Sequence, residues 1–433
     1  MSHGPRLRRR APFAELAPRS PSGATPRPTS PPVLVAEEDL RMAFQPIVSV
    51  REQTVFAVEA LARAHDPMRR EEVSPAVLFR VAEELEMIPE FDRFCRRRAA
   101  ELFLEASPPE DDVILSVNWD ARCLAAHEED PQQFSRLVSR LGLDPGKLMI
   151  EILESSVEDT RALVRFAHAR RREGFLIAVD DYGIGHSSLE RVAAIEPDVI
   201  KVDRFLVQGL ATSHPKREAC RAVVEMARHV GAIAVAEGIE REEDVLAALS
   251  VGFDFFQGYF FARPDADYLH AKLLALARVE ALKPRVAELS RTEIEARRKE
   301  LLHLERILEV VLDSLETLGP SEFDALLARV LSEEVSLEAA YVLDANGVQV
   351  TDTHLRRARA DDRRARAFRP ARRGADQSLK DYFLVPSLGY RTYTSRPYVS
   401  MATGHLCVTI SRYFTARDGG SYLLCCDVPR SGR

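Results

Sequence analysis

The chain has 433 residues, 46% of them hydrophobic, and a formal net charge of −7 at pH 7. This length predicts two or three domains, and the mild charge argues against attraction of the whole chain to DNA or RNA. No apolar run approaches the ~20 residues that a membrane-spanning helix needs, and none follows the basic N-terminus as in a secretory signal. Because the six cysteines are few for this length and form no CxxC pair, we expect a reducing compartment and predict a cytoplasmic protein.

The first 35 residues are rich in Arg, Pro and Ser and carry six arginines against one glutamate. Such a segment cannot bury enough apolar surface to order itself, so we predict a disordered basic tail over residues 1–35. Weak contact with an acidic partner is the alternative.

Residues 36–275 alternate short apolar runs with longer amphipathic stretches. The runs, which we interpret as strands, are Val55–Leu61, Val113–Val117, Leu148–Leu153, Phe175–Val179, Val199–Val202, Ala232–Ala236 and Phe253–Phe256. Helical patterns lie between them at Pro75–Glu84, Asp159–Arg171 and Lys216–His229. This alternation predicts a parallel sheet. Seven or eight units of about 30 residues favour an α/β fold of the TIM-like (β/α)8 barrel type over an open sheet.

Residues 276–318 are predicted to form a helical linker, with one long helix over 284–318. An apolar seam recurs at alternating steps of three and four residues through Leu301, Leu304, Leu308, Val311, Leu315 and Leu318. This spacing is typical of a coiled coil. Packing of the seam against the chain's own domains is the alternative to pairing with a second chain.

Residues 319–433 are predicted to form a small α+β domain. A helical pattern at Glu322–Ser332 precedes strand-like pieces at Ala340–Leu343, Val348–Thr351, Tyr398–Ser400, Cys407–Tyr413 and Tyr422–Val428. Asp344–Gly347 has the composition of a hairpin turn. The segment 356–373 holds nine arginines and two aspartates; we interpret it as a flexible solvated insertion, with anion binding as the alternative.

Polar side chains lie at the end of every predicted barrel strand. They are Glu59, Asn118, Glu151 with Glu154, Asp180 with Asp181, Lys201 with Asp203, Glu237 with Glu240, and Gln257. A single polar residue at a strand end is usually a cap or a loop anchor. Because the carboxyl ends of barrel strands meet at one mouth, the repeated pattern predicts a gathering of acids, an amide and a lysine there.

Carboxylates gathered in one mouth repel one another unless a cation neutralises them. Oxygen donors without a Cys or His cluster favour Mg²⁺ or Mn²⁺ over Zn²⁺. We expect two such ions, a pair that suits attack of water on a phosphodiester.

These residues lie in motifs that resemble those of EAL-domain cyclic di-GMP phosphodiesterases. Glu59-Ala60-Leu61-Ala62-Arg63 resembles the EALxR signature, and Gln45-Pro46-Ile47 resembles the family's QPI element. The further matches, in chain order over about residues 38–270, are Ser116-Val117-Asn118, Glu151-Ile152-Leu153-Glu154, Asp180-Asp181-Tyr182-Gly183-Ile184-Gly185, Ile200-Lys201-Val202-Asp203-Arg204, Ala236-Glu237-Gly238-Ile239-Glu240 and Gln257-Gly258-Tyr259, followed by Pro264.

The resemblance implies a role for each matched residue. The metal ligands would be Glu59, Asn118, Glu151, Asp180, Asp181 and Glu237. Lys201, Glu237, Gln257 and Glu59 would be catalytic: Gln257 would orient the water, and Lys201, its pKa lowered beside two cations, could accept a proton. Substrate contacts would come from Gln45, Arg63 (on a phosphate), Asp203, Arg204, Glu240, Gly258, Tyr259 and Pro264 (at a guanine site). Glu154 would support the loop after Asp181, and the product would be the linear dinucleotide pGpG.

Three departures from the family pattern leave alternatives open. Leu153 stands where a threonine is expected, and Ile184 and His186 alter the loop that in the family couples the dimer interface to metal binding. A cyclic di-GMP receptor with weak or no turnover, signalling through the C-terminal domain, is therefore the alternative to the enzyme. An unrelated barrel metallohydrolase would leave the motif matches as coincidence.

The C-terminal domain resembles, more loosely, the PAS-like or Cache-like sensory modules that follow some EAL domains. That resemblance implies a pocket for a small-molecule signal, and the alternative is a domain that only mediates dimerisation. In either case we expect a homodimer.

Overall fold

The computed structural model describes residues 40–66, 71–108, 111–124, 132–153, 159–183, 189–356 and 368–430. The predicted tail 1–35, Glu154, Ile184, His186 and most of the arginine-rich segment lie outside these ranges. The chain forms two compact units that divide between Leu289 and Ser290. Within the described ranges, we find no helix with the length and hydrophobicity needed to cross a bilayer.

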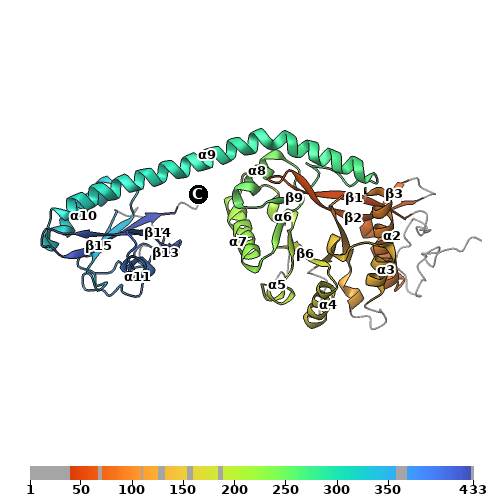
Figure 1. Cartoon of the computed structure of the whole chain (residues 1–433), viewed down its shortest axis with the longest axis horizontal. Coiled ribbons are helices and arrows are strands. Elements are labelled where there is room, and N and C mark those ends of the chain that lie inside the picture. The colour runs from red at the N-terminus through yellow and green to blue at the C-terminus, as the bar shows by residue number, and fades with distance from the viewer. Residues whose placement is uncertain are drawn as a thin grey trace, which may run out of the picture. The chain divides into compact units, whose positions relative to one another are not determined.

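Eight strands close the first unit into a barrel, which confirms the predicted TIM-like fold (Figure 1). They are β1 (Leu40–Ser49), β2 (Thr54–Asp66), β4 (Ile114–Trp119), β5 (Leu148–Leu153), β6 (Leu176–Tyr182), β7 (Val199–Val202), β8 (Ile233–Ala236) and β9 (Phe255–Gln257). The order around the barrel is β1-β9-β8-β7-β6-β5-β4-β2, and β1 also pairs with β2 to complete the ring. The short β3 (Glu71–Val73) pairs antiparallel with the last residues of β2.

The prediction of a purely parallel sheet is wrong at β1. This strand runs antiparallel to both β2 and β9, because only the few residues between Ser49 and Thr54 join β1 to β2 and a parallel pair would need a long crossover. Sequence analysis missed β1 because it is buried along nearly its whole length and lacks the alternating pattern of a half-buried strand.

Helices pack around the outside of the strands. They are α1 (Pro75–Glu84), α2 (Ile88–Ala106), α3 (Gln133–Leu141), α4 (Thr160–Arg172), α5 (Leu189–Ile195), α6 (Arg204–Val207), α7 (His214–Val230) and α8 (Glu242–Val251), with short 3₁₀ turns at Ala121–Leu124 and Pro145–Lys147. The three helices predicted in this region, those of α1, α4 and α7, are confirmed, α1 with the same bounds.

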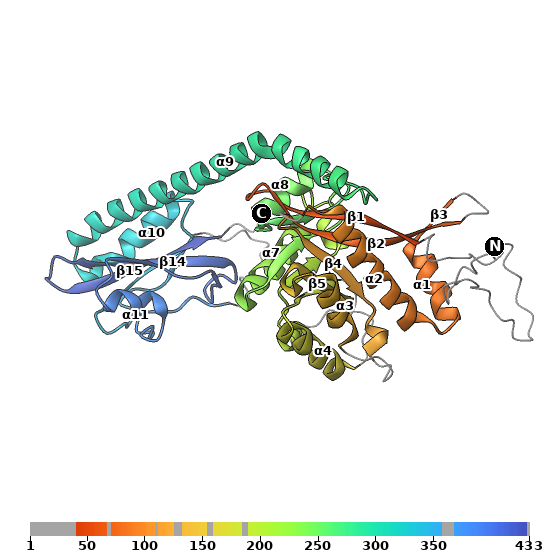
Figure 2. The same cartoon turned by 45° about the vertical axis from the view of Figure 1, so that its right-hand side comes forward.

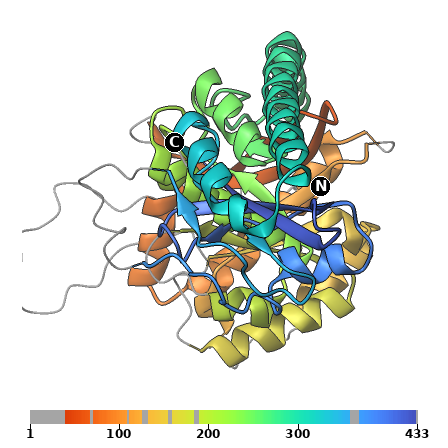
Figure 3. The same ribbon diagram turned by 90° about the vertical axis from the view of Figure 1, so that its left-hand side faces the viewer.

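The second unit is an antiparallel sheet with helices on both faces (Figures 2 and 3). Its strands are β10 (Ala339–Leu343), β11 (His354–Leu355), β12 (Thr392–Thr394), β13 (Tyr398–Val399), β14 (Leu406–Thr415) and β15 (Ser421–Pro429), in the order β11-β10-β15-β14-β12, with β13 also on β14. A 3₁₀ turn (Pro320–Glu322) leads into α10 (Phe323–Glu333), which covers one face, and α11 (Asp381–Ser387) packs on the other.

The predicted strand Val348–Thr351 is wrong. Val348 and Gln349 form only isolated bridges, to Asp376 and Leu343. The Asp344 carboxylate accepts hydrogen bonds from the amides of Asn346 and Val348, at 2.9 and 2.8 Å. The turn therefore forms, and the Val350 amide still donates to the Val342 carbonyl of β10 at 2.8 Å. No regular strand continues from it, and the later β11 is the strand that pairs with β10 on this side.

The long helix α9 (Tyr268–Glu316) begins earlier than the predicted 284–318 and contains Pro284 in its interior. Its leucine seam is internal: Leu304, Leu308 and Leu315 are buried against α10 and the sheet of the second unit. Of the two interpretations of this seam, packing within the chain is therefore the one observed.

Candidate active site

The alternation of side chains along the strands fills the barrel in two layers. Ile47, Ala57, Met149, Ala178, Val199 and Val235 form an apolar cluster inside the barrel. Because every second residue of a strand points inward, the next inward positions toward the mouth are Gln45, Glu59, Glu151, Asp180, Lys201 and Glu237, to which β4 and β9 add Asn118 and Gln257. The predicted strand-end residues therefore converge above one apolar layer.

Lys201 is the centre of this arrangement and is only 1% exposed. Its Nζ lies 2.7 Å from Glu151 Oε2 and 2.7 Å from Glu237 Oε1. It also lies 3.1 Å from Glu59 Oε2 and 3.3 Å from Asp180 Oδ1. One buried ammonium group thus faces four carboxylates from four strands.

Amides and a hydroxyl fix the orientation of two of these carboxylates. Asn118 Nδ2 donates to Glu59 Oε1 at 2.9 Å, and Gln257 Nε2 donates to Glu59 Oε2 at 2.8 Å. Ser116 donates to Glu151 Oε1 at 2.5 Å. Ser116 is a site residue without a predicted role, and its inward position two residues before Asn118 is the signal in the sequence that points to it.

Asp180, Asp181 and Glu237 form a separate cluster, with one carboxylate oxygen of each within 4.8 Å of the others. Asp181 has a positive φ of 54°, which is uncommon for a residue with a side chain and is found most often where function requires it. Three acids at this spacing could hold a divalent cation.

The protonation equilibria of the site are strongly shifted. Burial raises the pKa of Glu151 to about 8, and the nearby Glu59 charge adds to this effect. Burial and the Asp180 charge raise the pKa of Asp181 to about 6, and burial raises the pKa of Glu237 well above its usual value. Burial also pushes up the pKa of Glu59, but the Lys201 charge and the hydrogen bonds from Gln257 and Asn118 outweigh it and lower that pKa.

Burial alone would lower the pKa of Lys201. The surrounding carboxylates, Asp180 first among them, instead raise it well above its usual value. The expected lowering beside two cations remains a prediction about the metal-loaded site.

Two motif glycines allow the loops at the mouth to approach closely. A Cβ on Gly238, where φ is 62°, would lie 2.3 Å from Arg204 Cβ, and one on Gly258 would lie 2.1 Å from the Ile239 carbonyl oxygen. The loops after β7, β8 and β9 could not pack in this way with any larger residue.

A recess of about 210 Å³ opens beside the carboxylates. Its lining contains these predicted residues: Gln45, Glu59, Arg204, Glu237, Glu240, Gln257, Gly258 and Tyr259. Tyr259 is 50% exposed, and the Arg263 guanidinium carbon lies 4.3 Å from the centre of its ring. The recess therefore combines an exposed aromatic face with hydrogen-bonding groups.

Three predicted substrate residues lie outside that lining. Asp203 is buried and accepts from the Phe205 amide at 2.5 Å, so its side chain caps α6. Arg63 donates to the Ala62 carbonyl at 2.9 Å, and Pro264 is half-buried five residues after Tyr259.

The residues fit a divalent metal by their chemistry. The donors are carboxylate and amide oxygens, which Mg²⁺ and Mn²⁺ prefer. Asp180 Oδ1 is buried, and Lys201 Nζ lies 3.3 Å from it. Asp180 also belongs to the acid cluster with Asp181 and Glu237 and could supply a ligand atom.

The comparisons with known proteins agree on the first unit. The model of the EAL domain family matches residues 32–264, more than half of the chain. An uncharacterized protein, y4lL, of Sinorhizobium fredii is 33% identical over 240 residues, which cover 53% of this chain and 27% of that protein. The probable cyclic di-GMP phosphodiesterase PdeI of Escherichia coli is 28% identical over 233 residues, which cover 52% of this chain and 29% of that protein. The chain thus spans less than a third of the length of these two relatives.

A solved structure matches the fold of both units. The Bacillus subtilis YkuI protein, which has an EAL domain and was solved with its substrate cyclic di-GMP and calcium, superposes with a TM-score of 0.73 at 23% identity. The match covers 91% of this chain and 97% of that one.

Proposed function

Because the chain belongs to the EAL domain family, we propose that it is a metal-dependent phosphodiesterase that hydrolyses cyclic di-GMP to linear pGpG. The observation that carries this proposal is the convergence of four carboxylates, three of them buried, on Lys201 Nζ, with Asp181 beside them. The description of PdeI as a probable phosphodiesterase and the cyclic di-GMP in the YkuI structure support the choice of substrate.

Two Mg²⁺ or Mn²⁺ ions would be held by Glu59, Asn118, Glu151, Asp180, Asp181 and Glu237. When bound, such ions activate water and stabilise charge on the attacking and leaving oxygens of a phosphodiester. Lys201 keeps its carboxylate partners close together through direct contacts. In this proposal it would also exchange a proton with the water.

Gln257 is suited to orient the attacking water. Its Nε2 is fixed on Glu59 Oε2, while its buried Oε1 accepts no hydrogen bond from the described part of the chain. That oxygen can accept a hydrogen bond from the water. Arg63 would bind a substrate phosphate, and Tyr259 would stack on a base.

We further propose that the second unit regulates the barrel as a PAS-like or Cache-like module in a homodimer. In support, the face of its sheet that packs under α11 contains a buried polar cluster as well as aromatic rings. Asp427 is 2% exposed and accepts hydrogen bonds from Thr409 at 2.8 Å and Ser400 at 3.2 Å. A cluster of this kind could recognise a small-molecule signal. All six cysteines lie in the described ranges, and they are buried and form no disulfide there, which supports a reducing, cytoplasmic location.

The proposed activity is tested by turnover of cyclic di-GMP with Mg²⁺ or Mn²⁺, followed as pGpG on an anion-exchange column. We expect Glu59→Ala to lose turnover, because Glu59 contacts Lys201, Asn118 and Gln257 together. Glu105→Ala, which removes an exposed acid from α2, is the matched control and should behave as the wild type.

An assay with Ca²⁺ distinguishes the proposed enzyme from the alternative of a cyclic di-GMP receptor. Because Ca²⁺ is larger and prefers looser coordination, we expect binding of cyclic di-GMP with Ca²⁺ but little hydrolysis. Wild type that binds the dinucleotide yet turns over no faster than Glu59→Ala with any divalent ion would be a receptor.

A further inference from the structure

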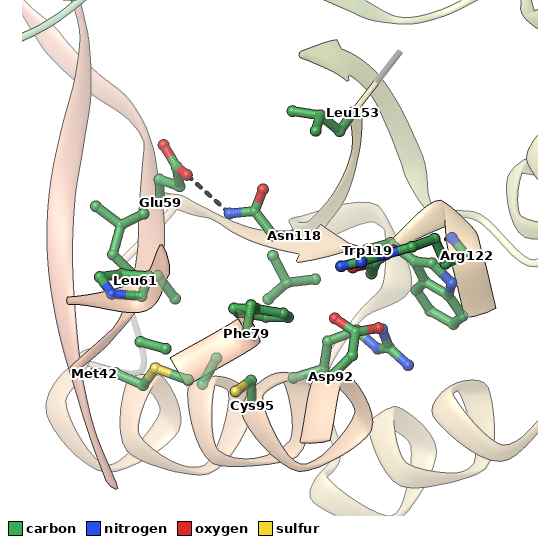
Figure 4. A pocket seen from close by; sticks show the side chains of 17 residues that line it. Met42, Glu59, Leu61, Phe79, Asp92, Cys95, Asn118, Trp119, Arg122 and Leu153 are labelled. Atoms are coloured by element: carbon green, nitrogen blue, oxygen red, sulfur yellow. Dashed lines mark hydrogen bonds and ion pairs between the residues drawn. The ribbon is translucent and has the colours of Figure 1, made fainter. Parts of the chain in front are cut away.

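The barrel strand β4 supplies a hydrogen-bond donor to each of its two neighbours. It pairs in parallel with β2 on one side and with β5 on the other. Asn118 of β4 donates to Glu59 Oε1 of β2 at 2.9 Å (Figure 4). Ser116, which lies two residues earlier and therefore on the same face of β4, donates to Glu151 Oε1 of β5 at 2.5 Å. One oxygen of each carboxylate is thus occupied by a donor from β4.

The two oxygens of Glu151 have different partners. Ser116 and Glu151 are both 0% exposed, and the short serine side chain on a paired strand fixes the donor to Oε1. The other oxygen, Oε2, accepts from Lys201 Nζ at 2.7 Å. Oε1 therefore faces the hydroxyl group of β4, and Oε2 faces the ammonium group on which the carboxylates of the site converge.

Divalent ions differ in how they use the oxygens of a carboxylate. Ca²⁺ accepts about six to eight oxygen ligands at flexible distances, including both oxygens of one carboxylate, whereas Mg²⁺ requires near-ideal octahedral geometry at shorter distances. Mn²⁺ shares the octahedral oxygen coordination of Mg²⁺. A hydrogen bond on Oε1 competes with coordination through both oxygens of Glu151, so it disfavours Ca²⁺ more than the two smaller ions.

We propose that Ser116 is a positioning residue that sets the choice of metal ion. By donating to Glu151 Oε1, its hydroxyl group leaves Oε2 as the oxygen that Glu151 offers to a cation, and the site thereby prefers Mg²⁺ and Mn²⁺ to Ca²⁺. This inference rests on the proposed function, from which it takes Glu151 as a metal ligand. It adds to that function a residue that acts on the metal only through Glu151.

A purely structural role of the Ser116 hydroxyl group would affect all metal ions alike. Its removal would leave a buried carboxylate oxygen without a donor, and the loss of a hydrogen bond to a metal ligand typically weakens metal binding about tenfold to hundredfold. The proposed role changes the ratio of the affinities for Mn²⁺ and Ca²⁺ as well. This ratio therefore distinguishes the two roles.

The test measures binding of metal ions to the full chain without cyclic di-GMP. Free Mn²⁺ is followed by its electron paramagnetic resonance signal, and the affinity for Ca²⁺ is obtained from displacement of bound Mn²⁺. In Ser116→Ala, we expect the ratio of the Mn²⁺ affinity to the Ca²⁺ affinity to fall by about tenfold or more. In turnover assays with Mn²⁺, Ca²⁺ should inhibit this variant at correspondingly lower concentrations than the wild type.

Further variants control for the loss of a buried hydroxyl group and for misfolding. Ser116→Thr keeps the hydroxyl group and should keep the wild-type ratio. Ser411→Ala removes a hydroxyl group from another fully buried serine, on β14 of the second unit, and should change neither affinity. The emission of Trp119, on the same strand as Ser116, reports whether β4 stays folded. If Ser116→Ala loses the wild-type emission, Ser116→Cys replaces it, because a thiol is only a weak donor.

Two results would overturn the inference. One is equal weakening of Mn²⁺ and Ca²⁺ binding in Ser116→Ala, which would show a purely structural role. The other is a Ser116→Thr variant with the same ratio as Ser116→Ala, which would show that the hydroxyl group is not the cause. A wild-type chain that binds no Mn²⁺ would instead overturn the proposed metal-dependent function.

Discussion

At the scale of single residues, the positive charge of Lys201 offsets the repulsion among the carboxylates that meet inside the barrel. Its ammonium lies within 3.3 Å of oxygens from Glu59, Glu151, Asp180 and Glu237. Removing one partner of a buried charge network is far more damaging than replacing the whole network, because the remaining charges stay buried without compensation. Lys201 therefore stabilises the site as well as serving its chemistry.

We expect Lys201→Met to abolish turnover and to lower the free energy of unfolding in EDTA by about 3 kcal/mol. Part of this loss should return on addition of Mg²⁺, because the cation takes over neutralisation of the acids. Urea denaturation at pH 7 with and without Mg²⁺ measures both effects, and Lys299→Met, at an exposed position of α9, is the control. Equal losses in the two variants would contradict the stabilising role.

Asp427 differs from the acids around Lys201 in its partners. It is a buried carboxylate that accepts hydrogen bonds from the hydroxyl groups of Ser400 and Thr409. Burial raises its pKa to about 6, above the value of about 3.9 in an unfolded chain. Between these values the folded state binds more protons, so Asp427 adds to stability as the pH falls from about 7 to about 4, and ionisation above pH 6 removes that contribution.

We expect Asp427→Asn to remove this dependence. The free energy of unfolding of the variant minus that of the wild type should be most positive at pH 8, and should fall by up to about 3 kcal/mol by pH 4. Urea denaturation at pH 4, 6 and 8 measures the difference. A difference that does not change with pH would show that Asp427 titrates normally.

At the scale of elements, α9 shows that a periodic apolar pattern can be buried over only part of its length. Its seam residues Leu304, Leu308 and Leu315 fill the core between α10 and the sheet. Leu301, one heptad before Leu308, is 56% exposed. The buried part of the seam thus begins at Leu304 and packs against its own unit, and Leu301 lies outside it.

The difference in burial between Leu308 and Leu301 predicts that replacing each of them by alanine has unequal effects on stability. Leu308→Ala should lower the free energy of unfolding by about 3 kcal/mol, because it leaves a cavity in a packed core, whereas Leu301→Ala should change it by less than about 0.5 kcal/mol. Denaturation at two protein concentrations completes the test. A large effect of Leu301→Ala that weakens on dilution would indicate a coiled coil with a second chain instead.

At the scale of the whole molecule, the chain consists of two units with separate cores. Ligands of the barrel stabilise only the unit that binds them. We therefore expect two calorimetric transitions. Mg²⁺ with cyclic di-GMP should raise the midpoint temperature of one of them, and Leu308→Ala should lower the midpoint temperature of the other. A single transition that both changes move together would show that the units unfold as one.

The sequence by itself determined three features: the barrel, the polar residues at the ends of its strands, and the gathering of those residues at one mouth. These features follow from local rules: apolar runs alternate with helical patterns, and side chains alternate along each strand, so that Ala57 leads to Glu59 and Val199 to Lys201. Each of these inferences needs only residues that are neighbours in the chain.

The tertiary structure alone decided which distant residues meet. Three features depend on contacts between separate segments of the chain: the antiparallel β1, the internal seam of α9 and the loss of the regular strand at Val348–Thr351. A local pattern states that a face is apolar or that a strand ends, but the partner of that face is set by competition among all segments of the folded chain. The strand-end pattern predicted that acids and a lysine meet at one mouth, but only the folded chain shows which four carboxylates contact Lys201 Nζ.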